Sequence, residues 1–160
     1  LVGLSDELRD QNPFDLSGGQ MRRVAIAGIL AMQPDILVLD EPSSALDPEG
    51  TESLYTLLGE LNKQRGLTIL VVEHDIAQVL PYADQFILME GGTVLQTGAC
   101  DQVFSFMWNN KVFTEAIPPL WQIKLALEAD TGYHFTKWRN DQDAATELYT
   151  LLQKGALLGA

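Results

Sequence analysis

The sequence predicts an α/β protein whose strands form a mostly parallel sheet with flanking helices. Residues 36–39 and 67–72 are short, almost wholly aliphatic runs, as expected of strands that are buried on both faces. Helical patterns alternate with these runs, which is typical of strand–helix–strand units. The composition changes near Cys100, where aromatic residues and amphipathic helical segments follow. We therefore expect residues 1–100 to form an α/β domain and residues 101–160 to form a helical C-terminal extension.

The first helix is expected to begin after Ser17, because Ser17 and Gln20 have the spacing of a capping box. It should end near Met32, because Pro34 follows and lacks the backbone N–H that a helix needs. The aliphatic run after this proline is then predicted to be the first strand.

A second helix is expected between the two strands. Asp47 is suited to cap it, Pro48 to occupy its first position and Gly66 to end it. Four leucines are expected to form its buried stripe: Leu54, Leu57, Leu58 and Leu61.

Further elements are expected after the second strand. Asp75 can cap a short helix, and Gly91-Gly92 is the signal of a tight hairpin between two strands. Pro119 is expected to begin a helix, and Asp143 is expected to cap the last one. The apolar face of the last helix is predicted to carry three leucines: Leu148, Leu151 and Leu152.

Composition and charge exclude several classes of protein. The chain has 160 residues, 46% of them hydrophobic, which is enough to bury a core. Twenty-two acidic residues against 10 basic ones give a net charge of −12, which disfavours binding to nucleic acid. The only cysteine, Cys100, rules out an internal disulfide. No apolar run is long enough to span a bilayer and no signal peptide is present, so we expect a soluble chain of the cytosolic type.

The segment Leu16-Ser17-Gly18-Gly19-Gln20 is a candidate anion site. Two glycines before a helix expose backbone N–H groups, and the start of the helix adds the positive end of its dipole. Together these groups suit a phosphate. An ordinary capped helix behind a Gly-Gly turn explains the same residues, because capping boxes are common.

Polar side chains follow both predicted strands. Asp40 and Glu41 end the first, where α/β sheets bind ligands. Asp40 is suited to hold Mg²⁺, and Glu41 to polarise an attacking water. His74 follows the second strand and can donate a hydrogen bond to a phosphate oxygen. Each residue also fits a solvated turn, and Asp47 fits a helix cap whatever else it does.

Four segments of the chain, taken in their order and spacing, closely resemble the ATPase subunits of ATP-binding-cassette (ABC) proteins, which have a P-loop NTPase-type fold. Residues 16–20 are similar to the signature motif of that family and residues 36–41 to its Walker B strand. Residues 44–47 resemble its D-loop, and His74 its switch histidine. The resemblance to the ATPase core covers about residues 1–98.

The resemblance implies an ATPase that works as a pair. In the family, two ATPase domains sandwich two ATP molecules head to tail. Ser17, Gly18 and Gly19 would then contact the γ-phosphate held by the opposite subunit, with Gln20 beside them. Asp47 would communicate across the dimer.

The same resemblance implies which residues carry the chemistry. Asp40 would help to hold Mg²⁺, and Glu41 would act as the general base. His74 would steady the γ-phosphate and the attacking water.

A finer resemblance is to energy-coupling factor (ECF) transporters, which import vitamins and transition-metal ions. It is carried by these segments: residues 13–28, 97–98, 102–104 and 118–120. It implies two further partners, a transmembrane scaffold protein and a substrate-binding membrane subunit. It also implies a place at the cytoplasmic face of a prokaryotic cell membrane. The membrane partner selects the transported substrate, so this chain does not identify it.

The sequence departs from the family in one respect, because it contains no P-loop. That motif requires Gly-Lys, and this dipeptide does not occur in the chain. We therefore expect the fold to be incomplete at its N-terminus and the chain to be the C-terminal part of a longer ATPase. These 160 residues alone are expected neither to bind ATP tightly nor to hydrolyse it.

Two alternatives compete with a transporter ATPase. One is an ABC ATPase that acts on nucleic acids or ribosomes, which the acidic charge and the lack of long heptad arms disfavour. The other is a non-catalytic remnant that lends its signature motif to a complete partner ATPase. Arg22 and Arg23, beside the signature motif, are expected to be solvated helix charges.

Overall fold

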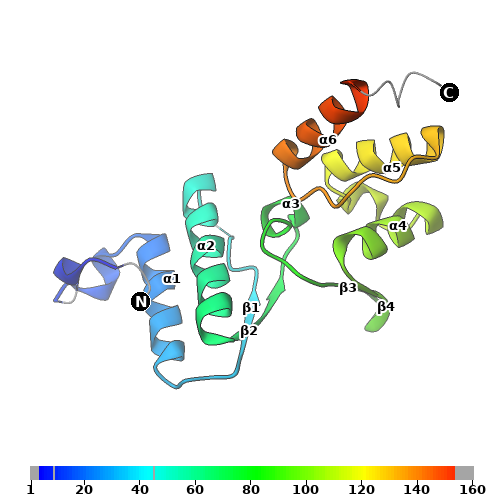
Figure 1. Cartoon of the computed structure of the whole chain (residues 1–160). Helices are drawn as coiled ribbons and strands as arrows, with labels where there is room; N and C mark the ends of the chain where they lie inside the picture. The colour runs from blue at the N-terminus through cyan, green and yellow to red at the C-terminus, as the bar shows by residue number, and fades with distance from the viewer. Residues whose placement is uncertain (1–3, 9, 45, 154–160) are drawn as a thin grey trace. The chain divides into compact units, whose positions relative to one another are not determined.

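The computed structural model describes residues 4–8, 10–44 and 46–153 (Figure 1). The chain forms two compact units, Leu1–His74 and Asp75–Ala160. The elements of the first unit are η1 (Asp6–Leu8), η2 (Pro13–Asp15), α1 (Gly18–Leu30), β1 (Ile36–Asp40), α2 (Pro48–Arg65) and β2 (Thr68–Val72). Those of the second are α3 (Ile76–Val79), β3 (Phe86–Glu90), β4 (Thr93–Gly98), α4 (Cys100–Asn110), η3 (Thr114–Ala116), α5 (Pro119–Thr131) and α6 (Asp141–Gln153).

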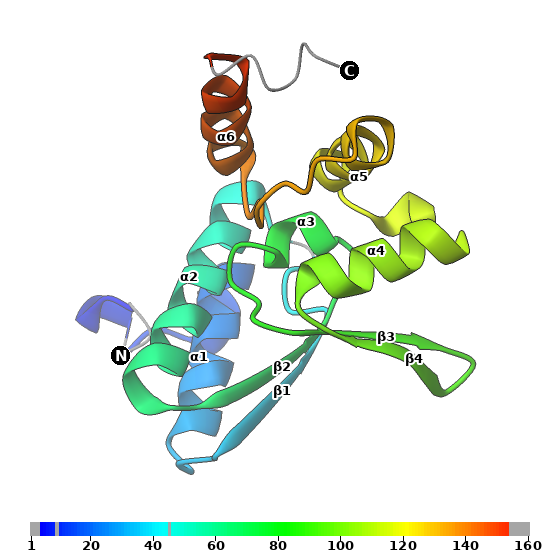
Figure 2. The same ribbon diagram turned by 45° about the vertical axis from the view of Figure 1, so that its right-hand side comes forward.

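The first unit contains the expected parallel strand pair. β1 and β2 are parallel and in register, so that Leu37 pairs with Ile69 and Asp40 with Val72. α2 lies against β2, and α1 lies beside α2 (Figures 1 and 2). The four predicted leucines of α2 are all buried, as is Leu37 of β1. The core of this unit therefore lies between its helices and one face of the strand pair.

The prediction that these strands are buried on both faces is wrong for this chain. Ile36 and Val38 are each 61% exposed, and Leu70 and Val72 are 44% and 50% exposed. They alternate with the inward-facing residues along each strand, so they share the opposite face of the pair. Aliphatic residues at every position indicate a layer on each side of a sheet, and the described residues of this unit supply only one.

The predicted starts of α1 and α2 are confirmed. The Ser17 hydroxyl accepts a hydrogen bond from the Gln20 backbone N–H (3.2 Å), and the Gln20 side chain accepts one from the Ser17 N–H (2.8 Å). The Asp47 carboxylate accepts the Gly50 N–H at 2.8 Å, and α2 ends at Gly66 with φ of +66°. α1 ends at Leu30, two residues earlier than expected.

The second unit has a sheet of its own. β3 and β4 form the predicted antiparallel hairpin around Gly91 and Gly92, so the described strands form two separate pairs, one parallel and one antiparallel. α4 lies in the extension that was expected to be helical, although its bounds were not predicted, and it lies against this hairpin (Figure 2). Its apolar residues join α5 in one core: Leu80, Cys100, Val103, Phe104, Met107, Ile117, Trp121 and Leu125.

The last helix begins earlier than expected. α6 starts at Asp141, and the Asn140 side chain accepts the Asp143 backbone N–H at 2.9 Å. Asn140 therefore takes the capping contact predicted for Asp143, whose carboxylate instead accepts the Arg139 N–H at 2.8 Å. Leu151 is buried and Leu148 packs on a small core beside it, but Leu152 is 53% exposed, so its predicted place on the apolar face is wrong. None of the described helices combines the length and the apolar character that crossing a membrane requires.

Candidate functional site

The C-terminal ends of β1 and β2 bring two predicted site residues into contact. Glu41 directly follows β1 and His74 lies two residues beyond β2, and their side chains are joined by a hydrogen bond of 2.7 Å between Nε2 and Oε1. The parallel register explains this contact, because it places the ends of both strands at one edge of the sheet. The His74 side chain is 85% exposed and that of Glu41 46%, so both can meet a ligand from solution.

Glu41 has an unusual backbone conformation for a residue with a side chain. Its φ is +44°, in the left-handed region that favours glycine. Its N–H donates to the Val72 carbonyl at 2.9 Å, and its carbonyl accepts the Ser44 N–H at 3.1 Å. The chain therefore turns sharply at Glu41, directly after the strand.

Asp40 is exposed at the last position of β1. Among residues 4–8, 10–44 and 46–153, no group of three or more His, Cys, Asp and Glu side chains could hold a metal ion. A site made wholly of protein ligands is therefore not present in this part of the chain. A single exposed carboxylate does suit Mg²⁺ held jointly with phosphate oxygens and water, which is the usual mode for that ion.

The start of α1 presents hydrogen-bond donors in an open position. A Cβ added to Gly18 would meet no described atom within 4 Å, and one added to Gly19 would meet only Leu46 Cδ2, at 3.8 Å. The Ser17 hydroxyl accepts a hydrogen bond as the cap and still has its own proton to donate. The backbone N–H of Ser17, by contrast, already donates a hydrogen bond to the Gln20 side chain. The site fits a phosphate through the Ser17 hydroxyl and the first glycine N–H groups.

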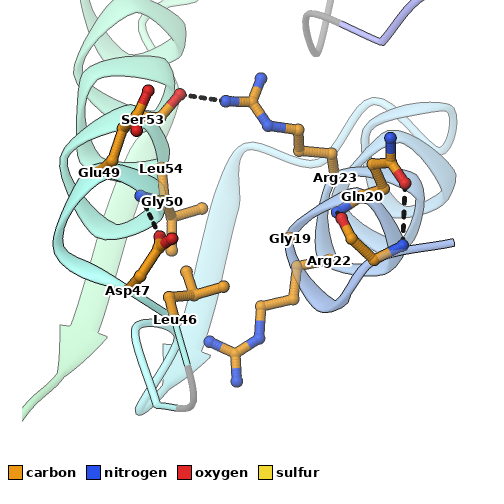
Figure 3. Close-up of a pocket in the computed structure, with 11 residues that line it drawn as sticks. Gly19, Gln20, Arg22, Arg23, Leu46, Asp47, Glu49, Gly50, Ser53 and Leu54 are labelled. Carbon is orange, nitrogen blue, oxygen red and sulfur yellow. Dashed lines mark hydrogen bonds between the residues drawn. The ribbon is translucent and has the colours of Figure 1, made fainter.

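A pocket of about 280 Å³ lies between the starts of α1 and α2 (Figure 3). Its lining includes these predicted site residues: Ser17, Gly19, Gln20 and Asp47. Arg22 and Arg23 also line it, and the expectation that they are solvated charges is wrong. Arg22 donates to the Ser44 hydroxyl at 3.0 Å, and Arg23 donates to the Ser53 hydroxyl. Arg22 therefore links α1 to the segment that leads into α2, and Arg23 links α1 to α2 itself. Ala45, within the predicted D-loop, lies outside the described residues.

The predicted site residues thus form two groups. Ser17, Gln20 and Asp47 share the pocket, whereas Glu41 and His74 meet at the ends of the strands and are not among the residues that line it. The hydrogen bonds of the described residues do not link the two groups directly.

Comparison with known proteins gives a consistent result. A family model described as ABC transporter matches residues 1–44. The energy-coupling factor transporter ATP-binding protein EcfA2 of Bacillus cereus is 42% identical over 156 residues, covering 97% of this chain and 53% of that protein. EcfA2 of Streptococcus thermophilus is 52% identical over 135 residues, covering 84% of this chain and 48% of that protein. The chain spans about half the length of these curated relatives.

Solved structures agree with the sequence relatives. The structure of cbiO1 from Clostridium perfringens, described as part of an ABC transporter complex, matches with a TM-score of 0.61 and 38% identity over 79% of this chain and 49% of that one. A dimeric bacterial ABC transporter cassette matches with a TM-score of 0.53 and 37% identity over 61% of this chain and 42% of that one. The chain belongs to the ABC transporter ATPase family. The predicted fold class, a P-loop NTPase-type α/β fold, is thereby confirmed, and the described residues contain part of its sheet.

This ABC ATPase segment also contains a contact that the sequence did not reveal. The carboxylate of Glu73 accepts hydrogen bonds from the Ser43 N–H (3.1 Å), the Ser43 hydroxyl (2.6 Å) and the Tyr55 hydroxyl. Burial raises the pKa of Glu73, but hydrogen bonds from Ser43 and Tyr55 outweigh it and hold the pKa below its usual value. The alternation of side chains along a strand is the sequence signal that could have indicated this contact. It places Glu73 on the same face as Val71, and it places His74 on the opposite face.

Proposed function

We propose that this ABC segment is the catalytic and signature-bearing part of an ATP-hydrolysing subunit that energises an ECF-type importer. The Glu41–His74 contact at the ends of two adjacent parallel strands carries the proposal, because it places a carboxylate and an imidazole together on an accessible edge. The names of the sequence relatives support the transporter class. The ATPase domain would extend to about residue 100, with residues 101–160 as its C-terminal extension.

The position of each residue supports the catalytic role that we propose for it. Mg²⁺ bound with ATP neutralises charge on the phosphates, and Asp40 would share in holding that ion. The Glu41 carboxylate would accept a proton from the attacking water, since it is exposed and needs only one oxygen to keep its contact with His74. The His74 imidazole would donate its N–H either to the Glu41 carboxylate, which it orients in this structure, or to a phosphate oxygen, because a neutral imidazole has a single N–H.

The separation of the two groups of residues supports a paired ATPase. Ser17, Gly18, Gly19 and Gln20 lie at a different place from Glu41 and His74, so they would serve the nucleotide of a second ABC ATPase subunit. Asp47, in the same pocket as Ser17, would sense that partner. This second ATPase can be another copy or a different subunit.

The remaining partners follow from the transporter class. A transmembrane scaffold protein and a substrate-binding membrane subunit would hold the paired ATPases at the cytoplasmic face of the membrane. Vitamins or metal ions would be the substrates, and the membrane subunit would choose among them. The net charge of −12 argues against nucleic acid as a partner.

The first experiment compares the chain with a chimaera. The chimaera joins the part of the Bacillus cereus relative that precedes the aligned region to the N-terminus of this chain. We expect the 160-residue chain to show neither micromolar ATP binding nor turnover, because it contains no Gly-Lys of a P-loop. The chimaera should hydrolyse ATP in the presence of Mg²⁺. Turnover by the chain alone, or none by a folded chimaera, would contradict the proposal.

The second experiment tests the base. Glu41→Gln in the chimaera should bind ATP and lose turnover by about 100-fold or more, within the range for loss of a general base. Glu60→Gln, which removes an exposed carboxylate from α2, is the matched control and should leave turnover unchanged. Near-normal turnover in Glu41→Gln would remove this residue from the role.

A further inference from the structure

We infer that Glu73 is a positioning residue, which holds the turn after β1 so that Glu41 and His74 face each other. The inference rests on the proposed function, because the importance of the pair depends on it. Glu73 is not a catalytic residue in this scheme. It acts through the backbone of the turn and through His74, its neighbour in the chain.

The contacts of Glu73 tie three parts of the first unit together. One carboxylate oxygen, Oε1, accepts from both the backbone and the hydroxyl of Ser43, at 3.1 and 2.6 Å. The same oxygen accepts from the Tyr55 hydroxyl, which lies on α2. The residue after β2 is thereby joined to the turn after β1 and to α2, the helix that lies against β2.

The turn that Glu73 holds is the one with the strained residue. Glu41 has φ of +44°, a conformation that persists in a residue with a side chain only when its surroundings enforce it. The Glu41 N–H donates to Val72, and its carbonyl accepts from Ser44. Those two bonds fix the turn at its ends. Glu73 fixes Ser43 between them, and Arg22 binds the Ser44 hydroxyl, so Glu73 restrains the turn from the side of β2 and Arg22 from the side of α1.

The alternation of side chains gives Glu73 and His74 different tasks. Glu73 is half-buried toward Tyr55, whereas the His74 side chain is 85% exposed. One strand end therefore supplies an inward anchor and an outward functional group in consecutive residues. Because Oε1 of Glu73 already accepts three hydrogen bonds, Glu73 serves as the anchor, and Glu41 is the more accessible of these two glutamates.

Kinetics of the chimaera distinguish a positioning role from binding. Glu73→Ala should lower kcat about tenfold and leave the KM for ATP within about twofold, because charge-assisted hydrogen bonds are lost without loss of a nucleotide contact. Glu73→Gln keeps an acceptor oxygen and should recover part of kcat. Tyr55→Phe removes one of the bonds and should cost about threefold. Glu60→Ala is the matched control for an exposed carboxylate on α2.

A spectroscopic measurement on the 160-residue chain does not depend on activity. Tyr55→Phe should shift the backbone resonances of Glu41 and the ring resonances of His74, although Tyr55 is distant from both in sequence. Tyr149→Phe, which alters an exposed tyrosine in the second unit, should leave those resonances unchanged.

The outcomes separate the two proposals. Unchanged kcat in folded Glu73→Ala, or unchanged Glu41 resonances in Tyr55→Phe, would overturn the positioning role. A kcat that falls only in proportion to the folded fraction would do the same. If the chimaera is inactive or Glu41→Gln keeps its turnover, the proposed function fails, and the resonances still decide whether Glu73 controls the turn.

Discussion

At the N-terminus of α2, the contribution of Asp47 to folding can be tested separately from its proposed role in the site. Asp47 caps this helix by accepting the Gly50 N–H at 2.8 Å, and Asp47 is also the residue proposed to sense the partner ATPase. A Cβ added to Gly50 would lie 2.7 Å from the same Asp47 oxygen, which is too close. Gly50→Ala must therefore displace the carboxylate from its capping position.

The expected energies follow from this single clash. Asp47→Ala should lower the free energy of unfolding by about 1 kcal/mol, the usual value of an N-cap. Gly50→Ala gains up to about 1 kcal/mol of helix propensity but loses the cap, so its net effect should be near zero. In the double variant the cap is lost only once. The double variant should therefore be about 1 kcal/mol more stable than the sum of the two single effects predicts.

Hydrogen exchange of the α2 amides in the four chains measures these energies. Tryptophan fluorescence would not serve, because all three tryptophans lie in the second unit. Additive effects within about 0.3 kcal/mol would refute the clash, and an unchanged free energy of unfolding in Asp47→Ala would refute the cap. Asp47→Asn keeps the cap and should retain stability. If that variant nevertheless slows ATP hydrolysis in the chimaera, Asp47 has a role beyond the helix.

Other substitutions test burial and ionisation. Leu37→Ala should destabilise the first unit by about 2–4 kcal/mol, whereas Val38→Ala, on the exposed face of the same strand, should cost less than about 0.5 kcal/mol in a urea titration followed by circular dichroism. Burial raises the pKa of the Cys100 thiol, so the folded chain should resist a thiol reagent at neutral pH. The free energy of unfolding should fall as the pH rises past the usual thiol pKa of 9.0, because the thiol ionises more easily in the unfolded chain. Burial also raises the pKa of Glu147, but hydrogen bonds led by that from the Thr136 hydroxyl outweigh it and lower the pKa. The unfolding midpoint of the second unit, followed by tryptophan fluorescence, should therefore fall as the pH drops through and below 4.5, and Glu147→Gln should flatten that dependence.

Local sequence rules correctly predicted where helices begin or end at positions where a single residue determines the backbone conformation. Ser17 and Asp47 cap helices because their side chains reach the first free N–H groups, and Gly66 ends α2 because a left-handed residue is needed there. The start of α6 was missed because Asn140 and Asp143 are both good caps. Their relative position in the helix, which the sequence does not decide, determines which one accepts the N–H.

Long-range features were predicted less completely. Asp40, Glu41 and His74 were each expected at strand ends, and the parallel register of β1 and β2 then accounts for the contact between Glu41 and His74. No role was predicted for Glu73, because nothing in the local sequence distinguishes it from a solvated turn residue. Its importance depends on Tyr55, which lies 18 positions away along the chain and reaches it only in the folded unit.

The two helix starts that share the pocket differ in the residue that caps them, and this difference bears on the proposed phosphate site. Both Ser17 and Asp47 accept a backbone N–H, but a serine hydroxyl keeps a proton to donate whereas an ionised carboxylate only accepts. The first position of α2 is Pro48, which has no N–H, and Glu49 adds further negative charge in its first turn. An anion is therefore favoured at α1 and disfavoured at α2, although both helices point positive dipole ends into one pocket. Ser17→Asp would keep the helix cap but make this start resemble that of α2, so the helix should remain while phosphate binding is lost. That result would show that the proposed phosphate ligand, and not folding, requires serine at this cap.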